Sequence, residues 1–337
     1  MNSRLPIVLS IALAATSCDK AKSLVGKATT TVKEKITAVS SGKPAGANKP
    51  AAAPVDPALQ KLVDQTAEGT MFRKDLPFPT RLEVRTTVRQ ELSGRSTQSS
   101  AFGKQASALN GTQTTKIKLE RDGNQVTYVL EQSGSELPAA ANPAKDKKAA
   151  ASPVAVPPPP APPVIFRKTG KAWGADNRVD FRAAALAKDL SPVFEQLLID
   201  NALASRPLWF SKHRFKIGDE LVVEGQFLPL LVAGNAKGSF KLKLAAFESV
   251  EGHPCGVFAV TGDYNRQQIP DFEGTFSDEE VTIQSGKLWL SLIYPVILKE
   301  ELDTIKTIKS GGHGGLAARG QGSFKIAVTR AWKSREP

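Results

Sequence analysis

Histidine and cysteine, the side chains most used in metal sites and nucleophilic catalysis, are scarce in this chain. The sequence holds three histidines and two cysteines in 337 residues, and only His253 and Cys255 stand close together. A zinc site needs three or four ligands, and a Cys/His dyad needs an accessible thiol. No further ligand clusters with this pair, and Cys255 opens the apolar run 255–260, which is typical of a buried thiol. We therefore predict neither a metal site nor a catalytic dyad here.

The remaining motifs with possible chemistry indicate turns and loops. The glycine-rich stretch 310–315 precedes a predicted strand, whereas a phosphate-binding loop opens a helix and usually carries Lys with Ser or Thr. Residues 278–280, with Asp271 and Glu273 nearby, have carboxylates for Ca²⁺ but lack the spacing of a calcium loop. No G-x-S-x-G nucleophile motif is present. The sequence predicts a protein that is not an enzyme and uses no cofactor.

The N-terminus has the pattern of an export signal. Arg4 is the single charge in residues 1–17, and the apolar run 5–15 has the length of a signal-peptide core. This run is shorter than the roughly 20 apolar residues that span a bilayer. We therefore predict that residues 1–17 are a cleaved signal peptide.

The four residues Ala15, Thr16, Ser17 and Cys18 resemble the lipobox of bacterial lipoproteins. Ala15 stands where Leu is commonest in that family. The resemblance implies cleavage before Cys18, acylation of its thiol, and a lipid-anchored protein of the bacterial cell envelope that faces the periplasm or the cell surface. Two or three acyl chains hold a protein firmly at a membrane, whereas one does so only marginally. The alternative is a plain secretory signal in which Cys18 is incidental.

Residues 18–57 have the composition of a flexible tether. They are rich in Lys, Ala and Pro, and seven lysines stand against three acidic residues. Such a segment cannot bury enough apolar surface to offset the entropy lost on ordering. The lysines either attract anionic lipid headgroups or keep a linker solvated. Although the net charge is +12, no dense basic stripe with interleaved aromatics appears, so we predict no nucleic-acid partner.

A second low-complexity stretch, residues 134–163, is rich in Pro and Ala. The segments on either side of it, 124–134 and 164–173, both read as strands. Because loop length costs little free energy, a hairpin with an enlarged loop fits this pattern better than a domain boundary. We therefore predict that residues 58–337 form one domain interrupted by a disordered insert at 134–163.

Alternating apolar and polar residues predict that this domain is mainly β. Asp122-Gly123 is expected at the tip of a hairpin, and Ser285-Gly286 at the turn of another hairpin spanning residues 279–294. Residues 296–308 fit a helix or an edge strand, and their β-branched residues favour the strand. The segments predicted as strands are 81–91, 114–120, 125–131, 238–247, 255–264 and 322–332.

One helix is well marked. Ser191 is a good N-cap, Pro192 suits the first helical position, and Pro207 bounds the C-terminal end. A shorter helix is expected at 57–67. The predicted fold is a single curved antiparallel sheet or half-barrel of eight to eleven strands, with one or two covering helices. In architecture and compartment, though not in any motif, this resembles the half-barrel lipid carriers of bacterial envelopes.

Two runs carry more apolar residues than one buried face requires, namely 226–234 and 288–298. They fit core packing, a lipid-sized cavity or a partner surface. The first functional hypothesis is an apolar ligand such as a lipid chain, and the alternative is a structural or assembly lipoprotein that docks another envelope protein. The residues predicted to line a ligand pocket are Phe227, Leu228, Leu230, Leu231, Trp289, Leu290, Ile293 and Tyr294.

Overall fold

A computed structural model describes residues 54–100, 103–136, 162–175, 191–232, 236–268, 276–311 and 317–335. All of them lie in one compact unit, Ala52–Pro337. The predicted signal peptide, Cys18 and most of the tether 18–57 lie outside the described residues. So do most of the insert 134–163, Asp271 and Glu273, and residues 312–316 of the glycine-rich stretch.

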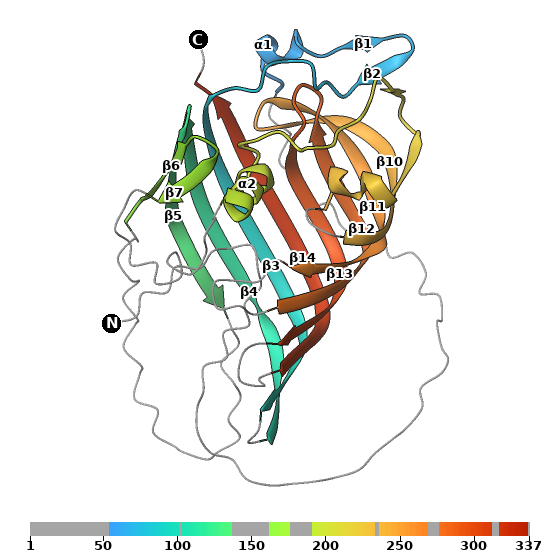
Figure 1. Cartoon of the computed structure of the whole chain (residues 1–337). Helices are drawn as coiled ribbons and strands as arrows, with labels where there is room; N and C mark the ends of the chain where they lie inside the picture. The colour runs from blue at the N-terminus through green and yellow to red at the C-terminus, as the bar shows by residue number, and fades with distance from the viewer. Residues whose placement is uncertain are drawn as a thin grey trace, which may run out of the picture. The chain divides into compact units, whose positions relative to one another are not determined.

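Eleven strands form one antiparallel sheet, which confirms the predicted fold class (Figure 1). Its two outermost strands, β7 and β9, do not pair with each other, so the sheet is open. In spatial order the strands are β7 (Ala172–Ala175), β6 (Val164–Thr169), β5 (Gln125–Glu136), β4 (Gly103–Asp122), β3 (Arg81–Ser100), β14 (Ala317–Ser334), β13 (Ile297–Gly311), β12 (Phe276–Ser291), β11 (His253–Gln268), β10 (Ala236–Val250) and β9 (Glu220–Glu224).

Smaller elements lie beside this sheet. A three-stranded sheet joins β1 (Gln65–Thr66), β2 (Gly69–Met71) and β8 (Arg214–Phe215). The helices are α1 (Pro57–Gln60), α2 (Ser191–Asp200) and the 3₁₀ helix η1 (Gly225–Leu230). The helix predicted at 57–67 is thus only four residues long, because residues 65–71 form the β1–β2 hairpin instead.

Helix α2 begins where Ser191 and Pro192 predicted it and ends seven residues before Pro207. Ala202 has a left-handed backbone (φ 58°), which stops the helix. The Leu203 N–H then bonds the Leu198 carbonyl, and the Ala202 N–H bonds the Ile199 carbonyl. This is a Schellman motif with alanine at the position that usually holds glycine.

The predicted hairpin at 279–294 is wrong, because β12 runs through Ser285 and Gly286 as one strand with a bulge. Gly286 lies between Val260 and Leu302 on the neighbouring strands. A Cβ there would come within 2.6 Å of Leu302 Cδ2 and 2.9 Å of Val260 Cγ1. Glycine therefore serves close packing between three strands, and not a turn.

Three further expectations are resolved by the register. Residues 297–311 are a strand, as favoured, but an interior one between β12 and β14. The β4–β5 turn is centred on Gly123, with φ +58°, and Asn124, since Asp122 already pairs with Gln125. Strands β5 and β6, which flank the insert, pair antiparallel, as expected for a hairpin with an enlarged loop.

A buried ion cluster joins three central strands. Glu279 of β12 is only 2% exposed and accepts hydrogen bonds from Arg266 Nε of β11 (2.7 Å) and Lys306 Nζ of β13 (3.0 Å). Burial raises the pKa of Glu279, but the attraction of Lys306 and Arg266 outweighs it and lowers the pKa from 4.5 to about 2. The carboxylate is therefore charged in the folded protein at any ordinary pH.

This pKa shift makes stability depend on acidity. A lowered carboxyl pKa stabilises the folded state fully above pH 4.5, and that stabilisation, about 3 kcal/mol, is lost as pH falls toward 2. We expect Glu279→Gln to flatten this acid dependence and to cost about 3–5 kcal/mol at neutral pH, because two buried cations lose their partner. Denaturant unfolding at pH 7, 4.5 and 3 measures both effects. Glu280→Gln, at an exposed ion pair on the same strand, is the control; equal behaviour of the two variants would refute the argument.

Candidate functional site

The inward face of β9–β12 is apolar and is covered by segments with little regular structure. We call residues 57–78, 191–215 and 225–232 the cover. The sheet contributes Val223, Phe240, Leu242, Leu244, Phe258, Val260, Val281, Ile283, Leu288 and Leu290 to one buried cluster. The cover contributes Phe72, Trp209, Phe210, Phe215, Leu228, Leu230 and Val232. The main apolar core therefore lies between an open sheet and this cover.

Phe72 is the centre of this core. Its ring lies 5.0 Å from that of Phe210, 5.4 Å from that of Phe215 and 5.3 Å from that of Phe258. Beneath it on β11 is Gly256, where a Cβ would come within 2.4 Å of the ring. The glycine leaves the space that the phenylalanine fills, so the sheet and the cover fit each other at this point.

Helix α2 is held at the other end of the sheet by a second aromatic group. The Phe194 ring lies 4.2 Å from that of Phe166 on β6 and 4.7 Å from that of Trp173 on β7. Figure 1 shows the helix lying across the sheet. These rings make α2 part of the cover.

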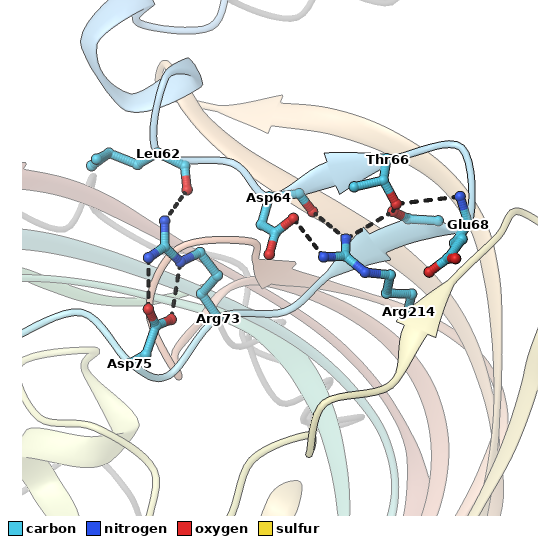
Figure 2. Close-up of polar contacts among 8 residues, drawn as sticks. Leu62, Asp64, Thr66, Glu68, Arg73, Asp75 and Arg214 are labelled. Atoms are coloured by element: carbon cyan, nitrogen blue, oxygen red, sulfur yellow. Dashed lines mark hydrogen bonds and ion pairs between the residues drawn. The ribbon is translucent and has the colours of Figure 1, made fainter.

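Two arginine side chains make contacts near the β1–β2 hairpin, and one of them links two of the three segments of the cover (Figure 2). Arg214 of β8 donates to the Asp64 carboxylate (2.8 Å) and the Gly69 carbonyl (3.3 Å). Arg73 donates one hydrogen bond to the Leu62 carbonyl (2.8 Å) and a bidentate pair of hydrogen bonds to the Asp75 carboxylate. Arg214 therefore ties residues 191–215 to residues 57–78.

The sheet also holds the C-terminal end of α2 through side chains. Arg330 of β14 donates to the Asp200 carbonyl (2.6 Å), and Trp332 Nε1 donates to the Ala202 carbonyl (3.0 Å). Arg121 of β4 donates to the Leu203 carbonyl (2.8 Å). Cations are favourable at a helix C-terminus, where carbonyls lack helical partners.

Backbone hydrogen bonds between the cover and the sheet are sparse among the described residues. Two bonds reach the β12–β13 connection, from Arg73 N–H to the Leu292 carbonyl and from Arg206 N–H to the Pro295 carbonyl. The Arg206 side chain is 7% exposed and reaches the Leu231 carbonyl (3.2 Å). Burial lowers its pKa, and the charge of Asp200 opposes that shift. Within the cover, β2 and β8 form a short ladder, whereas the described contacts between the cover and the main sheet are individual polar contacts and apolar packing.

His253 and Cys255 do not form a catalytic pair. Cys255 is fully buried, its thiol contacts the His253 carbonyl, and burial raises its pKa. His253 Nε2 lies 2.6 Å from Ser291 Oγ, which also accepts the N–H groups of Ile293 and Tyr294. The serine hydroxyl therefore donates to the histidine, and both groups secure the β12–β13 connection. Cys255 has the buried position that the sequence indicated.

Burial lowers the pKa of His253 from 6.5 to about 3. A lowered histidine pKa favours the neutral ring, so folding gains stability above pH 6.5 and loses it as pH falls toward 3. We expect unfolding free energy to drop by about 2 kcal/mol between pH 6.5 and pH 5. His253→Gln should remove most of this slope in denaturant titrations, whereas His213→Gln, at an exposed ring, should preserve it. An unchanged slope in His253→Gln would contradict the assignment.

The predicted ligand residues divide into two groups. Leu228, Leu230 and Leu290 belong to the buried cluster, and Leu231 packs against it. Pro229 lies inside η1, and this 3₁₀ helix buries Leu228 and Leu230. The structure therefore brings these four leucines together at the apolar face.

The other four residues lie elsewhere. Phe227 is exposed on η1. Trp289 points to the opposite face of β12, where its Nε1 donates to Glu248 (2.8 Å) and Lys299 lies over its ring. Ile293 and Tyr294 are in the β12–β13 connection, and the Tyr294 ring lies 5.2 Å from that of Trp332. These four do not share a surface with the leucines, and their binding of a ligand stays a prediction.

Sequence reasoning missed the aromatic residues that the cover contributes to the site. Phe72, Phe210 and Phe215 stand in stretches with neither strand nor helix periodicity. The cluster of large aromatic residues between Trp209 and Phe215 was the available signal. The arginine contacts had no signal, because most of their acceptors are backbone carbonyls.

Among the described residues, no group of three or more His, Cys, Asp or Glu side chains has a metal-binding arrangement. None of the described helices is long and apolar enough to cross a bilayer.

Comparisons with known proteins give one structural likeness to report. No protein-family model matches the chain, and a search of curated proteins found no match. A solved structure described as "Lipid-protein interactions in lipovitellin" aligns with 77% of this chain at 10% identity and a TM-score of 0.31. The aligned part is 26% of the lipovitellin chain, so this chain spans about a quarter of it.

Proposed function

We propose that this protein is a lipid-anchored bacterial envelope lipoprotein that is not an enzyme and binds an apolar ligand, such as a lipid chain, beneath its cover. The observation that carries the proposal is that the apolar face of β9–β12 is buried by the cover and not by a further strand of the main sheet. Its cover is fastened by side-chain contacts and rings, so it can lift while every strand of the sheet stays paired. The export signal and Cys18 support the location and the anchor.

The energetics allow an exchange between the cover and a ligand. Moving a twelve-carbon chain out of water gains roughly 10 kcal/mol, at ~0.8 kcal/mol per CH₂. Lifting the cover breaks hydrogen bonds whose net worth is about 0.5–1.5 kcal/mol each and exposes the rings around Phe72. Exposing all seven core side chains of the cover would cost roughly 10–20 kcal/mol, at about 1.5–3 kcal/mol each. A twelve-carbon chain therefore offsets the lifting of only part of the cover, such as the segment that carries Leu228 and Leu230.

The anchor is tested by Cys18→Ala. We expect this variant to lose labelling by a radioactive fatty acid and to leave the membrane fraction, because the thiol is the attachment point. Cys255→Ala is the matched control and should keep both properties, since that thiol is buried. If the Cys18→Ala protein remained acylated, the lipobox assignment would be wrong.

The ligand is tested on the chain from Asp19 onward, which carries no acyl group of its own. Native mass spectrometry with lipid extraction should show bound lipid at a defined stoichiometry, or its uptake from added phospholipid. Arg121→Ala removes the bond from β4 to the Leu203 carbonyl of the cover and should speed uptake severalfold. Arg85→Ala, at an exposed ion pair away from the cover, should leave the rate unchanged. A protein mass unchanged by added lipid would sink the ligand proposal.

The alternative function, a structural or assembly lipoprotein that docks another envelope protein, is favoured by one separate observation. Strand β9 leaves an exposed apolar edge on the sheet. Docking there leaves the covered apolar face unused, so the two functions are compatible.

A further inference from the structure

One edge of the main sheet combines an unpaired strand with exposed apolar side chains. Strand β9 pairs with β10 on one side and with no described residue on the other. Val222 on β9 is 58% exposed, Ile217 just before it 63%, and Phe227 just after it 52%. These are three of the four large exposed apolar residues in the described part of the chain.

The opposite edge differs. Strand β7 is four residues long, and its large side chain, Trp173, is buried against Phe194 of α2. Proteins commonly protect edge strands by shortening them, charging them or covering them. Among the described residues, large exposed apolar side chains therefore occur on and beside β9 but not at the β7 edge.

The hydrogen-bond pattern shows which backbone groups of β9 are available. The Leu244 N–H bonds the Asp219 carbonyl, which fixes the phase of the β9–β10 ladder. Bonds to one neighbour alternate along an antiparallel strand, so Leu221 and Val223 face β10. Glu220, Val222 and Glu224 direct their N–H and C=O groups to the free edge. This is the arrangement that accepts an added strand.

The charges beside Val222 indicate the partner's chemistry. Glu220 and Glu224 flank Val222 on the outer face, opposite the buried Val223. Glu220 pairs with Lys241 and Lys243, whereas Glu224 makes no ion pair with a described residue. An added antiparallel strand is favoured if it places a Lys or Arg beside Glu224 and an apolar residue beside Val222.

A second copy of this chain fits the edge poorly. Antiparallel self-pairing centred on Val222 would set Glu220 directly opposite Glu224 of the other copy, twice. Like charges directly opposite are destabilising. We propose that the β9 edge binds, by strand addition, an extended segment of a different protein in which basic residues flank an apolar one. This site is separate from the covered apolar face, so either proposal can fail alone.

The test uses the mature chain and a labelled synthetic peptide of sequence TKTVTKT. Fluorescence anisotropy should show it binding at least tenfold more tightly than TETVTET, about 1.4 kcal/mol, because the acidic peptide meets Glu224 with like charge. Glu224→Lys should reverse this order. Hydrogen exchange should slow at the Val222 and Glu224 amides when the basic peptide is added and stay unchanged at Leu221.

Val222→Pro removes the free-edge N–H without taking a bond from β10, so the fold should survive and peptide binding should be lost. Val222→Thr keeps the N–H and is the matched control. If Val222→Pro unfolds, the hydrogen-exchange pattern of the unmodified chain still decides. Three outcomes would overturn the proposal: equal affinity for both peptides, a chain dimer that Val222→Pro dissociates, or binding to anionic vesicles that Phe227→Ser abolishes while neither peptide binds.

Discussion

The structure depends on burying one apolar face of an open eleven-stranded sheet, and the only other sheet in the described residues is a small one of three short strands. Closing a barrel or stacking another sheet would cover that face with regular backbone. Here the covering is done by segments whose backbone is mostly irregular, so carbonyl groups near the core must find donors elsewhere. Arg121, Arg206 and Arg330 are among those donors. The guanidinium group suits this role because it has five donors and stays charged when partly buried.

The strands were predictable from the sequence to the extent that one face is buried. Alternation in 238–247 and 322–332 located β10 and β14, and Ser191 with Pro192 located the start of α2. Their full lengths were not predictable, because both faces are polar toward the strand ends. Gly286 misled the interpretation because glycine marks turns and close strand packing alike, and only the neighbours Val260 and Leu302 distinguish the two.

The site was half predictable for a similar reason. The leucines of 226–234 predicted a buried segment, and four of the eight proposed ligand residues do meet at the apolar face. Trp289 alternates with Leu288 and Leu290 and therefore lies on the other face of β12. The sequence does not show which face is which, because this run is apolar on both. Phe72 joins this core from the far N-terminal end of the domain, and no local pattern shows that its ring fits over Gly256.

The main sheet is held by strand pairing and the cover by separate side-chain contacts, and this difference bears on function. Strand pairing in β10–β14 is continuous and opens only with the sheet itself, whereas the cover is a set of separate contacts, each worth about 1 kcal/mol. The separate polar contacts can break one at a time, so the proposed lifting of the cover would begin with them and would then have to expose the rings around Phe72. Strand β9 itself is held by its ladder with β10, whereas Phe227, beside this edge, lies on η1 and belongs to the cover. On the two proposals made above, a partner strand would extend the sheet at β9, and an apolar ligand would displace part of the cover.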